Sequence, residues 1–157
     1  MIQRVQTIWL LLASAFILAL FLFPYAQFSD ASGVAHALKV SGSFVHLQDQ
    51  QVSKESDWIG MVIAGILAVF PLFIIVKFNN RTLQLQLIKL LAGLLVAFGC
   101  WLLYRMNQAF KEAEIPMEPS QIGFGLYLLL ISLVFLWMAA NGVKKDIRLL
   151  KSADRLR

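Results

Sequence analysis

No charged side chain interrupts residues 58–76, which read WIGMVIAGILAVFPLFIIV. A helix needs about 20 mostly apolar residues to cross about 30 Å of hydrocarbon, and this stretch meets that requirement. Its apolar side chains surround the whole helix, which is typical of a helix in lipid and not of one at the surface of a soluble core. The stretch therefore predicts a membrane-spanning helix, which Pro71 is expected to kink.

Three more apolar stretches of similar length lie at about residues 7–24, 82–104 and 121–141. They explain why only 15% of the 157 residues are charged, whereas a typical soluble domain has about 25%. We therefore predict an all-α membrane protein, with four transmembrane helices in an antiparallel bundle that forms a single domain over residues 1–157.

The lysine and arginine residues are divided unequally between the two sides that four spans would create. Cytoplasmic loops carry the excess of basic residues, so the more basic side is expected to be cytoplasmic. We therefore predict that both termini are cytoplasmic in a multi-pass protein of the bacterial inner membrane. On this prediction the cytoplasmic side holds ten of the 14 basic residues: Arg4, Lys77, Arg81, Lys89, Lys144, Lys145, Arg148, Lys151, Arg155 and Arg157.

Two polar loops then lie outside the membrane, at residues 25–57 and 105–120. In the first loop, short segments with apolar residues flank a glycine turn at residues 41–43. Short strands on each side of such a turn predict a β-hairpin, here over residues 37–47. In the second loop, two prolines are expected to end any helical extension of the third span.

The tail after Gly142 has two faces when it is drawn as a helix, one apolar and one basic. A basic amphipathic helix is typical of a segment that lies on an anionic membrane surface. We therefore predict that residues 142–157 bend away at Asn141-Gly142 and lie along the cytoplasmic leaflet. The alternatives are a frayed basic tail, a straight extension of the fourth span, and a helix docked on a cytoplasmic partner. The basic face carries Lys144, Lys145, Arg148, Lys151 and Arg155.

Small residues recur at helical spacing in the first two spans. Such residues let two helix backbones approach closely in lipid. We interpret them as the packing face between the two spans; a docking face for another membrane protein is the alternative. The residues are Ala15 and Ala19 in the first span, and Gly60, Ala64 and Ala68 in the second.

Residues with catalytic or ligand chemistry are sparse and scattered. The single cysteine, Cys100, excludes an internal disulfide and a CxxC redox pair. His36 and His46 lack further ligands at metal-site spacing, and the amine of Lys89, inside the third span, is expected to reach the headgroups. We therefore predict no catalytic residues, no metal and no cofactor. The net charge of +5 is assigned to membrane orientation and not to nucleic acid.

The opening residues, Met1-Ile-Gln-Arg-Val-Gln-Thr7, resemble the start of an uncharacterised family of small four-helix integral membrane proteins of Bacteroidetes-type bacteria. The spans and the long first loop are similar in layout, so the resemblance covers nearly the whole chain. The family is a domain of unknown function, so the resemblance implies an inner-membrane location and supplies no catalytic residues. It draws attention to Gln3, Arg4 and Gln6 as a candidate cytoplasmic interface, where they could bond headgroups or a partner.

Three classes of function remain open. The first is a non-enzymatic accessory or scaffolding subunit of an inner-membrane envelope complex for protein export, assembly or lipid handling. Its partners would be the lipid bilayer and other membrane proteins. The second is a small oligomeric transporter or channel, and the third is a membrane enzyme acting on lipids. The absence of carboxylates within the spans disfavours the second class, and missing motifs count mildly against the third. We therefore favour the first.

Overall fold

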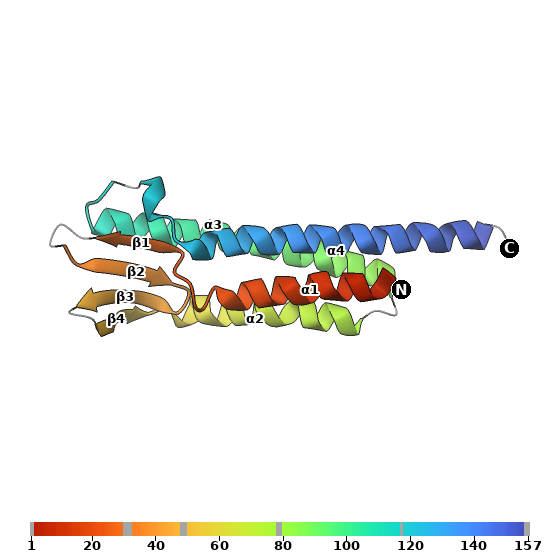
Figure 1. Ribbon diagram of the computed structural model, residues 1–157, viewed down its shortest axis with the longest axis horizontal. Helices are drawn as coiled ribbons and strands as arrows, with labels where there is room; N and C mark the ends of the chain where they lie inside the picture. Colours follow the sequence, from red (N-terminus) through yellow and green to blue (C-terminus); the bar gives the residue numbers. More distant parts are fainter. Residues whose placement is uncertain (1, 30–32, 48–49, 78–79, 117, 156–157) are drawn as a thin grey trace.

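The computed structural model is a helix bundle that carries a small antiparallel sheet at one end, opposite both termini (Figure 1). It describes residues 2–29, 33–47, 50–77, 80–116 and 118–155. The helices in these residues are α1 (Ile2–Ala19), α2 (Trp58–Val76), α3 (Arg81–Glu112) and α4 (Phe124–Arg155), with a short 3-10 helix, η1 (Pro119–Gln121). The strands are β1 (Ala26–Ser29), β2 (Ala35–Lys39), β3 (Gly42–Leu47) and β4 (Gln50–Ser56).

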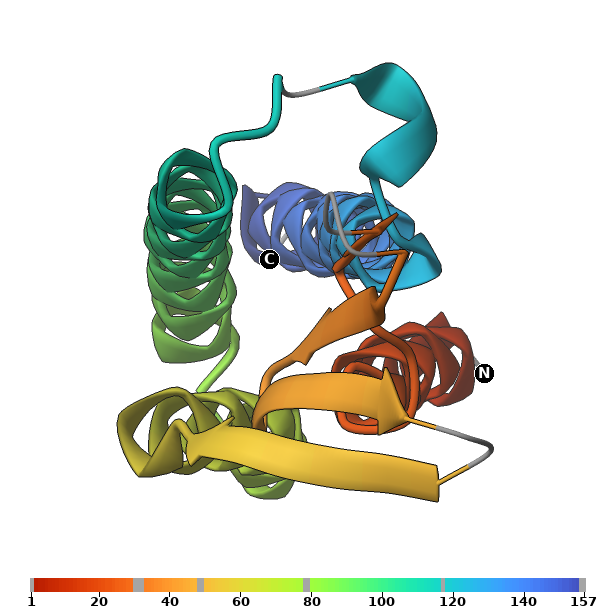
Figure 2. The same ribbon diagram turned by 90° about the vertical axis from the view of Figure 1, so that its left-hand side faces the viewer.

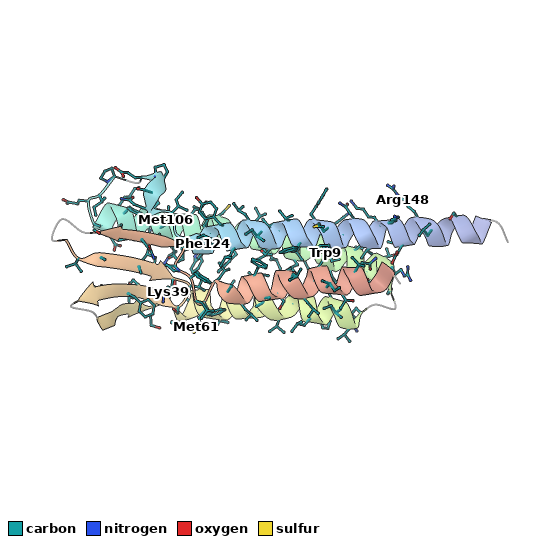
Figure 3. All side chains as sticks on the ribbon, viewed as in Figure 1. Trp9, Lys39, Met61, Met106, Phe124 and Arg148 are labelled. Carbon is teal, nitrogen blue, oxygen red and sulfur yellow. The ribbon has the colours of Figure 1, made fainter. Side chains whose placement is uncertain are left out.

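Helix α1 packs against α4 and α2, and α3 packs against α4 and, less extensively, against α2 (Figure 2). The bundle interior is filled by fully buried leucine and isoleucine side chains, and Trp9 stacks on Phe135 with ring centroids 5.7 Å apart (Figure 3). The outward faces are apolar too, as at Ile66, Val69 and Leu130, each more than half exposed. Since the surface is as apolar as the interior, lipid is the solvent that suits these helices.

Three of the described helices are long and apolar enough to cross a membrane. They are α2, α3 and the part of α4 from Phe124 to Leu149. The described apolar segment of α1, Val5–Ala19, is shorter. The predicted class of helical membrane protein is thus supported by α2, α3 and α4.

The predicted hairpin is confirmed, and it forms the middle of a larger sheet. Strands β2 and β3 pair antiparallel, with His36 opposite Val45 and Lys39 opposite Gly42. The full strand order is β1-β2-β3-β4, with every neighbouring pair antiparallel. The sheet lies against the end of α3, where Phe28 of β1 packs on Phe110 with ring centroids 4.7 Å apart.

Two helices differ in length from the predicted membrane spans. Helix α3 continues beyond residue 104 to Glu112, so half of the predicted loop 105–120 is helical. The extension is stabilised because Met106 and Phe110, almost fully buried, pack into the core beside the sheet. Helix α1 ends at Ala19 instead of residue 24, and hydrogen bonds such as Leu20 N–H to Ile17 O carry the chain through a tighter turn.

The predicted bend in α4 is wrong, because the helix runs through Asn141 and Gly142 without interruption. A Cβ atom at Gly142 would lie 2.9 Å from Cγ of Gln6 in α1. The glycine therefore permits close approach of α1 and α4 and does not end a helix. The next turn, with Val143 and Asp146 buried, packs on the bundle and not on headgroups. The helix predicted for the tail is confirmed as far as Arg155.

Candidate functional site

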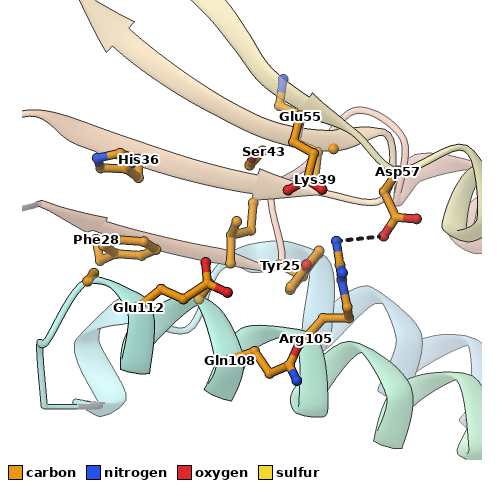
Figure 4. Close-up of a pocket in the computed structure, with 14 residues that line it drawn as sticks. Tyr25, Phe28, His36, Lys39, Ser43, Glu55, Asp57, Arg105, Gln108 and Glu112 are labelled. Carbon is orange, nitrogen blue, oxygen red and sulfur yellow. Dashed lines mark ion pairs between the residues drawn. The ribbon is translucent and has the colours of Figure 1, made fainter.

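A pocket of about 210 Å³ lies between the sheet and the last turns of α3 (Figure 4). Alternate residues of a strand point to the same face of the sheet, and so do residues that lie opposite each other on neighbouring strands. Phe28 lies opposite His36, and Ser43 lies opposite Leu38 on one side and Glu55 on the other. These side chains therefore form the wall on the side of the sheet. The opposite wall comes from one face of α3, at the i, i+3, i+4 and i+7 positions Arg105, Gln108, Ala109 and Glu112.

One ion pair fixes the base of the pocket. The Asp57 side chain caps α2, since its Oδ1 accepts a hydrogen bond from Gly60 N–H at 3.1 Å. Its Oδ2 lies 3.3 Å from Nη2 of Arg105 in α3. One carboxylate thus connects the start of α2 to α3, and it neutralises the arginine that faces the pocket. Because Arg105 is partly exposed, this pair contributes mainly to position and little to stability.

Two further carboxylates reach the pocket from opposite walls, Glu55 from β4 and Glu112 from α3 (Figure 4). Both are exposed, and neither makes an ion pair or hydrogen bond within the described part of the chain. The nearby Lys39 amine lies 5.2 Å from the centroid of the Phe44 ring. The pocket therefore holds two acidic groups without a basic partner.

Tyr25 lies at the sheet side of the pocket and is only 5% exposed. Its backbone N–H donates to Leu38 O at 2.8 Å, which ties the chain leaving α1 to β2. Burial raises the pKa of Tyr25 to about 12; Arg105 opposes this shift and Asp57 adds to it. The phenol therefore remains protonated in the physiological range and can donate a hydrogen bond.

A second polar cluster lies near the opposite end of the bundle. Gln6 Nε2 donates to Asp146 Oδ2 at 2.8 Å, and Arg81 Nη1 lies 3.1 Å from the same oxygen. Gln6 and Asp146 are about 95% buried. The cluster joins α1, α3 and α4, and it places Gln6 differently from the predicted headgroup contact.

Residues 2–156 match the sequence model of the DUF4293 family, which is described as a domain of unknown function. The chain belongs to the DUF4293 family. A comparison with curated proteins finds no match. The match confirms the predicted resemblance to an uncharacterised family. It also covers both polar clusters of this DUF4293 chain.

The small-residue stripe on α2 of the DUF4293 chain faces the interior. Gly60, Ala64 and Ala68 are buried, and the Ser14 hydroxyl of α1 donates to Ala68 O at 2.7 Å. At Ala68 the stripe contacts α1, whereas a Cβ atom at Gly60 would lie about 3.0 Å from the Trp101 ring of α3. In α1, Ala15 is exposed and Ala19 half-buried, so Ser14 is the small residue that contacts α2 there.

The other predicted residues lie apart from the pocket. Lys144, Lys145 and Arg148 are exposed on α4, at the end of the bundle that carries the termini. The side chains of Gln3, Arg4, Lys151 and Arg155 lie outside the described part of the structure. In the described residues, no three His, Cys, Asp or Glu side chains come together in a way that could hold a metal ion.

Sequence reasoning missed the pocket of this DUF4293 chain, although one signal was present. Residues 105–112 alternate between polar positions and the apolar positions Met106 and Phe110 at helical spacing. That pattern extends α3 and sets Arg105 and Glu112 on one face. No local pattern connects this face to Tyr25 or Glu55, which reach it only through the sheet.

Proposed function

We propose that this protein is a non-enzymatic accessory subunit of an inner-membrane envelope complex, with four spans, cytoplasmic termini and the sheet outside. The end of α2 and the start of α3 lie at the same end of the molecule as both termini (Figure 1). Lys77, Arg81 and Lys145 belong to that end, while Glu55 and Glu112 belong to the sheet end. This distribution supports the orientation, because basic residues accumulate on the cytoplasmic side.

The first span of this proposal is longer than helix α1. Four apolar residues, 20–23, continue from Ala19 to Pro24, and Leu22 and Phe23 are exposed on the surface of the bundle. Together with Val5–Ala19 they give an apolar stretch of about the length that a bilayer core requires. The exposed apolar side chains of the turn would then lie in lipid at the outer edge of the membrane.

Thiol labelling in intact cells tests this orientation. In a Cys100→Ala background, Ser120→Cys on η1 should react with an impermeant thiol reagent in spheroplasts. Ser152→Cys near the end of α4 should react only after lysis. Both serines are exposed, so accessibility should reflect the side of the membrane and not burial. The reverse labelling pattern would disprove the proposed topology.

The observation that carries the accessory role is a face of small residues on the outer surface of α3. Gly93, Ala97 and Cys100 are exposed there at helical spacing. Nothing lies within 4 Å of a Cβ atom built at Gly93, so this part of the helix surface is open. The chain uses the same kind of face, at Gly60 and Ala64, to pack its own helices. A similar face on the outer surface of α3 supports docking of a helix from another membrane protein.

Replacing Gly93 with leucine should weaken that docking. The leucine has space in the free protein, but it would separate the two helix backbones. Contacts of one such face contribute on the order of 1 kcal/mol, so we expect roughly fivefold less partner in mild-detergent purifications. Gly65→Leu on α2 is the matched control, because nothing lies within 4 Å of its Cβ position either. Equal recovery of partners with both variants would argue against the α3 face.

A further inference from the structure

The pocket between the sheet and α3 is lined by three acidic residues, Glu55, Asp57 and Glu112, and by two basic residues, Lys39 and Arg105, so one negative charge is in excess. Asp57 and Arg105 neutralise each other at 3.3 Å, and the Lys39 amine lies over the Phe44 ring. Glu55 and Glu112 remain, one on each wall, without a cation from the described residues. Two carboxylates that face one cavity are better stabilised with a bound cation than without one.

Tyr25 is an independent sign of a ligand. Its side chain is nine-tenths buried, and no hydrogen bond from the described residues engages its hydroxyl. Every fully buried side-chain oxygen or nitrogen in the described part of the chain has a hydrogen-bond partner, so a hydroxyl without a partner cannot be fully buried. The hydroxyl therefore opens into the pocket that Tyr25 lines, where it can donate to an oxygen of a bound molecule.

The described side chains that line the pocket do not form the ligand set of a metal ion held by protein groups alone. The pocket volume of about 210 Å³ is far larger than the roughly 10–15 Å³ that a single water needs. A divalent metal requires several ligands converging at about 2.0–2.6 Å. Within the described residues no group of three suitable side chains meets that requirement. The Tyr25 ring on the sheet side of the pocket suits an organic cation, because aromatic rings attract ammonium groups.

We propose that this pocket binds a small amino alcohol, with its ammonium group between Glu55 and Glu112 and its oxygen at the Tyr25 hydroxyl. The site goes beyond the accessory role and does not depend on it. The same chemistry occurs in free ethanolamine and in the ethanolamine headgroup of a phospholipid. Asp57 begins α2, so the base of the pocket lies at the level where lipid headgroups would meet the helices in the proposed orientation.

Titration calorimetry on the full chain in detergent tests the site with ethanolamine as the probe. Ethanolamine should bind saturably, and ethylene glycol, its uncharged counterpart, should not. The Glu55→Gln/Glu112→Gln variant should bind at least about tenfold more weakly, because both charge-assisted contacts are lost. Tyr25→Phe should weaken binding about threefold to tenfold through loss of one hydrogen bond. Glu114→Gln, an exposed acid near Glu112 and outside the pocket, is the matched control.

Nanodiscs distinguish the two sources of the ammonium group. In discs of phosphatidylglycerol the protein should bind free ethanolamine. If the lipid headgroup occupies the pocket, adding phosphatidylethanolamine should abolish that binding; unchanged binding assigns the site to a soluble amine. Circular dichroism verifies that each variant is folded. The proposal is overturned if folded protein binds no ethanolamine, binds ethylene glycol equally well, or is unaffected by the double glutamate change.

Discussion

Replacing Gly42 with alanine should unfold the sheet while the helix bundle remains folded. Gly42 joins β2 to β3 with φ +141°, a conformation that residues with a side chain rarely adopt. A Cβ atom there would overlap the carbonyl oxygen of Glu55 and lie 3.1 Å from Cα of Ser56. The backbone strain costs roughly 1–3 kcal/mol. The overlap adds to that cost, because β4 must move away from the turn to relieve it.

Hydrogen exchange measures this effect locally. Amides of β2, β3 and β4 should lose protection in Gly42→Ala, whereas those of α3 and α4 should keep it. Gly33→Ala is the matched control: Gly33 has φ +79°, but nothing lies within 4 Å of its Cβ position. It should cost only about 1 kcal/mol. Protection of the sheet in Gly42→Ala equal to that in Gly33→Ala would contradict the predicted clash.

The sequence predicted the parts of the fold that depend on local pattern. The apolar run at residues 58–76 became α2, and the glycine turn at Gly42 became the β2–β3 hairpin. Strand β1 was missed because its sequence, AQFS, has only four residues, and β4 was missed because its sequence, QQVSKES, is largely polar. They are strands because neighbouring strands pair with them, and such pairing often outweighs intrinsic preference.

The candidate site was hidden for a related reason. Its carboxylates come from the missed strand β4 and from the part of α3 that was predicted as a loop. Asn141-Gly142 was interpreted as a helix end, but contact with Gln6 gives the glycine a different role. In each case a residue distant in the sequence decides the outcome, and a single sequence contains no signal for that contact.

Removal of the Asp146 carboxylate should destabilise the bundle strongly. In Asp146→Ala the buried Gln6 amide loses its acceptor, and Arg81 loses its only described ion pair. A buried donor without a partner costs about 1–3 kcal/mol. The arginine adds less than a fully buried charge would, because its side chain is 29% exposed. We therefore expect a loss of about 2–4 kcal/mol in the free energy of unfolding in mixed micelles.

A double-mutant cycle separates this contact from the general effect of a core change. Gln6→Ala combined with Asp146→Ala should cost less than the sum of the two single changes, since each alone already breaks the same hydrogen bond. Asp146→Asn keeps an acceptor for Gln6 and removes the charge that faces Arg81, so its cost should be intermediate. Lys145→Ala, exposed on the same turn, should change stability by no more than about 0.5 kcal/mol. Additive costs for Gln6 and Asp146 would mean that the cluster does not hold α1 to α4, and that packing such as that of Trp9 on Phe135 does so instead.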